Sequence, residues 1–396
     1  MVSRLTPQER VIKAFRREKP DKVPKDFGWT PQIHQLIKEK TGSSDPLGYF
    51  DCEMRGVGWL PTKNKRDFSF YLGKPPSPFS NWIDKRFLEI QSTEAKKLPS
   101  FGGEWGKGKP PSSPWIDQEW GVGYIPTTSK DPRHSHLLGF AYPMRNLRTV
   151  KELKEYPFSD YEASYRHEHL EKEVKEIHRK NLCATGGLAV TIFEVSWQLT
   201  GMDKLFFDFM ENKPLANYLL DYITEMRRFQ IRRLAEAGVD SIHLGDDIGT
   251  QQGMMMSPEM WREWFKERMR SIISVAKKIN PEVIISYHSD GNVEKVIPEL
   301  IEIGIEVLNP VQPECMDPAK LKKKYGDKLA FWGTIGIQST MPFATPGEVK
   351  EIVRERIETV GKNGGLLIAP THVLEPEVPW ENILAFFEAV EEFGRY

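Results

Sequence analysis

A histidine and an aspartate stand two residues apart in the turn His288-Ser289-Asp290-Gly291. The mostly apolar residues 283–287 before it predict a buried strand. Because side chains two apart on an extended backbone share a face, His288 and Asp290 are expected to point at one spot just past that strand. An imidazole and a carboxylate there suit a divalent metal, a proton-transfer pair or a histidine oriented by a carboxylate. The alternative is structural: His288 bonds the rim of the sheet and Asp290 caps the next helix.

The second half of the chain alternates between predicted strands and predicted helices. Residues such as Thr345 and Glu348, which form a capping box around Pro346, mark where helices begin. Strands separated by helices imply a parallel sheet, and their number favours a closed α/β barrel over an open sheet. The strands are expected at 240–244, 283–287, 305–308, 329–332 and 366–369.

Polar side chains follow the predicted strands at the points where catalytic groups of barrels are found. Histidines and carboxylates that meet at one rim are more than helix capping usually supplies. For Asp246 and Asp247, however, capping of the next helix suits the sequence as well as catalysis does. The rim residues are Asp26, Trp29, Glu194, Asp246, Asp247, His288, Asp290, Asn309, Gln312, Thr334, Thr371 and His372.

The first half of the chain is less regular. A capping box at Thr6 and Glu9 predicts a helix that runs to about Arg17. Residues 60–117 are rich in Pro, Gly and aromatic residues and form an expected loop insertion, which serves either as a lid or binding loop or as a surface decoration. We interpret residues 1–396 as a single barrel domain with 60–117 inserted in its N-terminal part.

Composition excludes several classes of protein. The 396 residues carry a formal net charge of -1, with charged residues mixed along the chain, so a nucleic-acid partner is not expected. Cys52, Cys183 and Cys315 are widely spaced and odd in number, and no apolar segment is long enough for a signal sequence or a bilayer span. We therefore expect a cytoplasmic protein that does not contact membranes.

Five segments of the chain resemble the uroporphyrinogen decarboxylase superfamily. The resemblance extends over most of 180–394 and implies a (β/α)8 barrel. It also implies one of two activities: decarboxylation of uroporphyrinogen, or zinc-dependent methyl transfer involving corrinoids, coenzyme M or aromatic methyl ethers. The segments are Gly245-Asp246-Asp247-Ile248-Gly249-Thr250-Gln251, Tyr287-His288-Ser289-Asp290-Gly291, Leu308-Asn309-Pro310-Val311-Gln312-Pro313, Phe331-Trp332-Gly333-Thr334-Ile335 and Ile368-Ala369-Pro370-Thr371-His372.

The N-terminal segment distinguishes the two branches. True uroporphyrinogen decarboxylases resemble one another in an Arg-rich Met-Arg-Gln-Ala-Gly-Arg run that cradles the substrate's carboxylates. This chain has Lys25-Asp26-Phe27-Gly28-Trp29 in that region. Because a tetrapyrrole with eight carboxylates needs cationic partners, a rim of Asp and Glu would repel it. The resemblance is therefore closer to the corrinoid-dependent methyltransferase branch.

In that branch, zinc is held by a His-x-Cys pair after one strand and by a late third ligand, often Cys. Here His288 matches the histidine, Asp290 replaces the cysteine, and His372 lies near the late ligand. A His, Asp and His set is harder than a thiolate site and would accept zinc, manganese or iron. By this resemblance His288, Asp290 and His372 bind a divalent metal, with zinc expected, and Glu194 is an extra ligand or general acid.

The leading hypothesis is a metal-dependent methyltransferase that moves a methyl group between a small methyl ether, amine or thiol and a corrinoid (methylcobalamin) on a partner protein. A metal-independent lyase with Asp/His acid–base catalysis and a barrel that binds a ligand without chemistry are the alternatives. The sequence leaves open whether the protein forms a homodimer. Within this hypothesis the catalytic residues are Asp246, Asp247 and Glu194, and the substrate-binding residues are Trp29, Asn309, Gln312 and Thr334.

Overall fold

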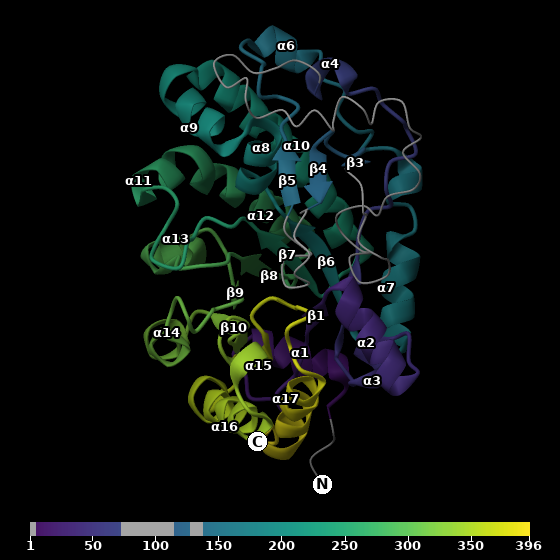
Figure 1. Cartoon of the computed structure of the whole chain (residues 1–396), viewed down its shortest axis with the longest axis vertical. Coiled ribbons are helices and arrows are strands. Elements are labelled where there is room, and N and C mark those ends of the chain that lie inside the picture. The colour runs from purple at the N-terminus through teal and green to yellow at the C-terminus, as the bar shows by residue number, and fades with distance from the viewer. Residues whose placement is uncertain (1–4, 73–114, 127–137) are drawn as a thin grey trace.

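A computed structural model describes residues 5–72, 115–126 and 138–396 of the chain (Figure 1). Most of the expected 60–117 insertion lies outside the described residues. Its described parts include a helical turn, α4 (Ser69–Leu72), and the strand β3 (Trp115–Ile116). β3 pairs antiparallel with β4 (Gly123–Pro126), which pairs with β5 (Leu138–Ala141). The proposed single-domain organisation of residues 1–396 stays a prediction.

The centre of the molecule is a parallel sheet of seven strands whose spatial order follows the chain. Each strand after the first is reached through at least one helix, which is the connection that parallel neighbours require. The sequence predicted five of these strands, and the structure places each within a few residues of the expected position. The strands are β2 (Met54–Val57), β6 (Cys183–Ala189), β7 (Ser241–Gly245), β8 (Ile284–His288), β9 (Val307–Asn309), β10 (Ala330–Ile335) and β11 (Leu366–Pro370).

The extended residues 23–26 fill the gap between the two ends of this sheet. The N–H of Asp26 donates to the Ile368 carbonyl at 3.1 Å, and the N–H of Ile368 donates to the Pro24 carbonyl at 2.9 Å, so the segment pairs with β11. On its other side, Glu53 Oε2 accepts a hydrogen bond from the N–H of Lys25 at 3.0 Å. The expected (β/α)8 barrel is confirmed, and a side chain completes its closure beside β2.

Helices surround the barrel (Figure 1). The helix that begins after Ser257 is interrupted by a π-helical turn, yet its apolar side chains, such as Trp261, Phe265 and Met269, are buried. A two-stranded ladder of β1 (Gly28–Trp29) and β12 (Val373–Leu374) lies beyond the main sheet. The main helices are α1 (Pro7–Phe15), α2 (Pro31–Thr41), α3 (Pro46–Tyr49), α6 (Val150–Lys154), α7 (Leu170–Arg179), α8 (Phe193–Thr200), α9 (Met202–Glu211), α10 (Lys213–Ala237), α11 (Pro258–Trp261), the π turn Arg262–Lys266, α12 (Glu267–Ile279), α13 (Ile297–Glu302), α14 (Pro318–Tyr325), α15 (Thr340–Phe343), α16 (Pro346–Arg356), the π turn Ile357–Gly361 and α17 (Trp380–Phe393).

Two apolar cores hold these layers together. The larger core packs the outer faces of the strands against the helices. The smaller core fills the lower interior of the barrel, because six of the seven strands each give it at least one buried side chain. Val11 and Phe15 of α1 close it from below, and the capping box of Thr6 and Glu9 that begins α1 is as predicted. The small core is made of Val11, Phe15, Met54, Cys183, Ile284, Val307, Ala330, Leu367 and Ala369.

The buried carboxylate of Glu53 is a testable part of the barrel closure. It also pairs with Arg10, at 3.4 Å, and both side chains are almost fully buried. Replacing Glu53 with Ala leaves a buried guanidinium and a buried N–H without this acceptor, so we expect the free energy of unfolding to fall by about 3 kcal/mol. Glu53→Gln, which keeps an oxygen acceptor, should lose less. Urea unfolding followed by circular dichroism measures both, and an unchanged Glu53→Ala variant would contradict this role.

Candidate functional site

Three side chains with metal-ligand chemistry meet at the C-terminal rim of the barrel. They are Asp247, after β7, and His288 and Asp290, at and after the end of β8, and one ligand atom of each lies within 4.8 Å of the others. Nε2 of His288 is 3.5 Å from Asp247 Oδ1 and 3.8 Å from Asp290 Oδ1. The buried Oδ1 of Asp290 has no hydrogen-bond partner among the described residues. We call these three residues the rim cluster.

Asn309, at the end of β9, fixes the orientation of the His288 ring. Its Oδ1 lies 2.6 Å from His288 Nδ1, and its Nδ2 donates to the Trp332 carbonyl at 3.1 Å. Because an amide oxygen only accepts, His288 Nδ1 must carry a hydrogen in this arrangement. In the neutral ring, the lone pair is then on Nε2, which faces the two carboxylates. This is the tautomer that a metal-binding histidine with a second hydrogen bond adopts.

The charges of the rim cluster depend on one another. Burial lowers the pKa of His288, but Asp247, Asp290 and the Asn309 hydrogen bond outweigh it, so this pKa is raised overall. Burial raises the pKa of Asp290, and Asp247 adds to the rise while His288 opposes it. The two negative carboxylates face a single positive charge when the His288 imidazole is protonated. A divalent cation would neutralise them more completely than that one proton does.

The donor atoms of the rim cluster fit a hard or borderline divalent metal. One imidazole nitrogen and two carboxylate oxygens resemble three-ligand sites with an open position. The main chain supports this geometry, since the N–H of Asp290 donates to Asp247 Oδ1 at 2.7 Å. Cys315, the cysteine nearest in sequence to the rim segments, is half-buried, and its Sγ donates to Gln312 Oε1 at 3.6 Å.

Glu194 and Asp246 lie next to the rim cluster and accept hydrogen bonds from backbone N–H groups around it. Both carboxylate oxygens of Asp246 accept from the N–H of Ile192, and one also accepts from the N–H of Glu194, so Asp246 caps the start of α8. Glu194 Oε2 accepts from the N–H of Asp247 at 3.1 Å. Burial, with Asp247 and Asp246 nearby, raises the pKa of Glu194 well above its usual range. Glu194 is thus placed to hold a proton beside the cluster, and Asp246 to position α8.

His372 and Trp29 lie at the edge of the site. Nε2 of His372 is 4.0 Å from Asp290 Oδ2, and its side chain is 41% exposed, more than His288 at 23%. Trp29 belongs to β1, which pairs with β12 directly after His372, and its buried indole N–H has no hydrogen-bond partner in the described part of the chain. The structure thus groups Asp247 with His288 and Asp290 more closely than His372.

Gln312, in the loop after β9, and Thr334, near the end of β10, lie on neighbouring segments of the rim. Gln312 Oε1 accepts from the N–H of Gly291 at 2.6 Å, which ties the loop after β9 to the loop after β8. Thr334 is fully buried in β10, has a φ of 77°, and its hydroxyl lacks a partner among the described residues. A non-glycine residue in the left-handed region stores strain of order 1 kcal/mol, a pattern that clusters at functional sites.

His243 is a site residue that sequence reasoning did not single out. Its Nδ1 lies 2.9 Å from the Ser286 hydroxyl, and its ring centroid is 4.8 Å from Trp332 and 5.9 Å from His288. Burial, followed by the charge of His288, lowers the pKa of His243 to about 3, so the ring is neutral at physiological pH. The available signal was the alternation of β7, which puts position 243 on the face of the strand that looks into the barrel.

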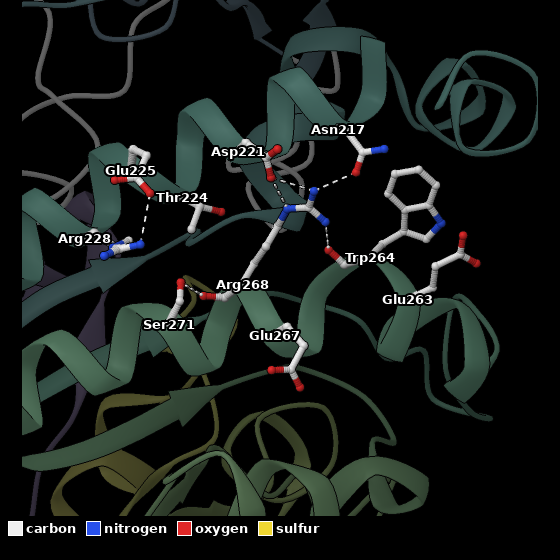
Figure 2. A pocket seen from close by; sticks show the side chains of 10 residues that line it. All are labelled: Asn217, Asp221, Thr224, Glu225, Arg228, Glu263, Trp264, Glu267, Arg268 and Ser271. Atoms are coloured by element: carbon white, nitrogen blue, oxygen red, sulfur yellow. Dashed lines mark hydrogen bonds and ion pairs between the residues drawn. The ribbon is translucent and has the colours of Figure 1, made fainter. Parts of the chain in front are cut away.

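A pocket of about 440 Å³ lies away from the rim, between α10 and the helices that follow β7 (Figure 2). Figure 2 shows the Arg268 guanidinium directed at Asp221 and Asn217, both of which it contacts at 2.8 Å. It also donates to the Trp264 carbonyl at 2.6 Å. Within the lining of this pocket, Arg268 pairs with Asp221 and Arg228 pairs with Glu225, and none of the predicted site residues lines it. The lining residues are Asn217, Asp221, Thr224, Glu225, Arg228, Glu263, Trp264, Glu267, Arg268 and Ser271.

Comparison with known proteins identifies the family. The family model described as uroporphyrinogen decarboxylase (URO-D) matches residues 139–393. The chain belongs to the uroporphyrinogen decarboxylase family. Among curated members, the uroporphyrinogen decarboxylase of Rickettsia africae is 25% identical over 276 residues, which cover 64% of this chain and 75% of the relative. That of Legionella pneumophila (strain Corby) is 24% identical over 183 residues, 46% of this chain and 49% of the relative.

A solved structure supports the same fold over nearly the full length of the chain. A methyltransferase from Methanosarcina mazei superposes with a TM-score of 0.58 and 18% identity, covering 98% of this chain and 99% of the other. At this identity the likeness establishes a shared URO-D-type barrel. In the part of the chain that the structure describes, no helix combines the length and apolarity needed to cross a bilayer.

The raised pKa of His288 can be tested without any metal. Asp290→Asn removes a carboxylate 3.8 Å from Nε2, so the pKa of His288 should fall in chelator-treated protein. Asp317→Asn, an exposed cap of α14, is the matched control and should leave it unchanged. NMR titration of the imidazole signals measures the midpoint. The same midpoint in Asp290→Asn and wild type would contradict the coupling.

Proposed function

We propose that this URO-D family member is a metal-dependent methyltransferase that moves a methyl group between a small substrate and a corrinoid carried by a partner protein. The observation that carries the proposal is the rim cluster, in which His288 Nε2 faces two carboxylates at 3.5 and 3.8 Å. Family membership adds support, as does the whole-chain likeness to a protein named as a methyltransferase. Zinc is the first metal to test, and manganese and iron also suit these ligands.

The metal would be held by His288, Asp247 and Asp290, with His372 at the edge of the set. When bound, it supplies Lewis-acid polarisation of the heteroatom that carries or accepts the methyl group. Asn309 keeps the His288 ring in one orientation and one tautomer. The N–H of Asp290 holds Asp247 in place. This preorganisation means that little rearrangement is needed when substrate arrives.

Two further groups have roles in proton handling. Burial and the nearby carboxylates raise the pKa of Glu194, which favours its protonated form, so it can hold a proton next to the cluster and release it to a leaving heteroatom. His243 stays neutral one layer deeper in the barrel, where its ring and that of Trp332 form an uncharged aromatic wall. The site thus combines a charged rim with an uncharged interior.

Decarboxylation of uroporphyrinogen fits this interior poorly, although the curated relatives carry that name. Side chains alternate between the two faces of each barrel strand, and none of the positions that face the interior in residues 23–26, β2 and β6–β11 is Lys or Arg. A substrate with many carboxylates would find no cationic partner on these strands and would meet the carboxylates of the rim.

Metal-independent acid–base catalysis is the second candidate. The raised pKa values of His288 and Glu194 favour it, because a raised pKa favours the protonated form that a general acid needs. A lyase of this kind would keep its activity after chelation, with a pH profile set by a carboxyl group and His288.

Metal content is the direct test. Wild-type protein purified without added metal, then incubated with zinc and desalted, should retain about one metal per chain, and His288→Ala should lose most of it. His34→Ala, which removes a histidine of α2, is the matched control and should retain the metal. Elemental analysis measures each. The absence of stoichiometric metal under every condition would refute the metal-dependent function.

Methyl transfer is tested in a second experiment on the same protein. With metal, the wild type should demethylate methylcobalamin in the presence of a thiol acceptor, and chelation should reduce the rate at least about 100-fold. Absorbance changes of the corrinoid report the reaction. Activity that survives chelation would support the acid–base candidate, and an intact cobalt–carbon bond under all conditions would support a binding protein.

A further inference from the structure

One wall of the barrel interior is made of small residues and leaves open space. Gly56 on β2 and Gly187 on β6 are exposed, and no heavy atom of the described residues lies within 4 Å of where a Cβ would sit on either. A Cβ on Gly186, by contrast, would meet Leu234 of α10 at 2.8 Å, so position 186 faces outward and position 187 inward. We call the space beside Gly56 and Gly187 the axial space.

His243 and Trp332 belong to the same interior. Gly187 is paired in register with His243, so their side-chain positions share a face of the sheet. The Trp332 ring lies 4.8 Å from that of His243 and 5.9 Å from that of Phe15, which closes the bottom. The axial space is therefore a well with an aromatic floor, and the rim cluster stands at its mouth.

Asp26 points into this well. Its neighbours point outward to α17, since Lys25 Nζ pairs with Glu391 and the Phe27 ring lies 5.0 Å from that of Phe387. Alternation along the extended segment then places the Asp26 side chain on the inner face. Among the inner-facing positions of residues 23–26 and strands β2 and β6–β11, Asp26 is the only carboxylate, because Asp247 and Asp290 lie in the loops after their strands.

Asp26 has no ion-pair partner in the part of the chain that the structure describes. Arg55 is near enough to lower its pKa, but the Arg55 guanidinium donates to the carbonyls of Cys52 and Met54. Burial, aided by Glu53, still raises the pKa of Asp26 to about 7. A half-buried carboxylate without a counter-charge is costly, so a cation that enters the well would gain from meeting it.

We propose that Asp26 binds an ammonium group of the substrate inside the axial space. The substrate is then a small, amine-bearing molecule whose methyl-carrying or methyl-accepting atom reaches the rim cluster while its ammonium end reaches Asp26. The glycine wall of Gly56 and Gly187 leaves room for the chain between the two ends. The substrate role rests on the proposed function, whereas the ammonium site itself does not.

Binding of n-butylammonium tests the ammonium site without knowledge of the true substrate. Calorimetry on chelator-treated protein compares it with 1-butanol, which has the same chain and no charge. Wild type should bind n-butylammonium at least about tenfold more tightly than Asp26→Asn does, because a charge-assisted hydrogen bond is lost, while 1-butanol binding should not change. Gly187→Leu, which fills the axial space, should weaken both ligands.

Asp290→Asn separates the two acidic sites. If the cation binds at Asp26, its affinity should persist in Asp290→Asn and fall in Asp26→Asn. Loss in Asp290→Asn with retention in Asp26→Asn would place the cation at the rim cluster and overturn the proposal, as would a wild type that does not bind n-butylammonium. Circular dichroism confirms that each variant is folded. Metal content and methylcobalamin turnover are measured separately, so failure of the proposed function is distinguishable from failure of this site.

Discussion

The parallel register of β7, β8 and β9 is the constraint on which the site depends. It places Gly245, His288 and Asn309 in one row across the sheet, at the level where the strands end. Position 245 must be glycine, because a Cβ there would lie 2.8 Å from that of His288. With that space free, the imidazole lies between the amide that orients it and the carboxylates that face it. A shift of one residue in this register would turn His288 out of the barrel.

The sequence predicted the barrel well, because its strands are short apolar segments between amphipathic helices with clear caps. It also placed His288, Asp290 and Asn309 at one rim. The choice between Asp247 and His372 as neighbour of His288 could not be made from sequence, since it depends on how far each loop turns back after its strand. The closure by Glu53 was equally hidden, because it is a side chain that bonds a backbone N–H beside the sheet. Asp246 does cap a helix, but the helix is α8, which precedes β7, and not the next helix that the sequence suggested.

The interior explains why the chemistry of this chain can differ from that of the decarboxylases in its family. The barrel strands and residues 23–26 line the axial space with His288, the neutral His243, the aromatic ring of Trp332 and the carboxylate of Asp26. Such a lining suits a small substrate of low or positive charge. Asp290 and Asp247 give the rim oxygen donors, which favour harder metals than thiolates do.

The central claim is that one metal is bound by His288, Asp247 and Asp290 without sulfur. X-ray absorption at the zinc edge of the zinc-loaded wild type tests it most directly. If these three residues bind the zinc, the zinc should have a first shell of nitrogen and oxygen at roughly 2.0–2.1 Å. A sulfur scatterer at about 2.3 Å would show that a cysteine such as Cys315 is a ligand and would contradict the account.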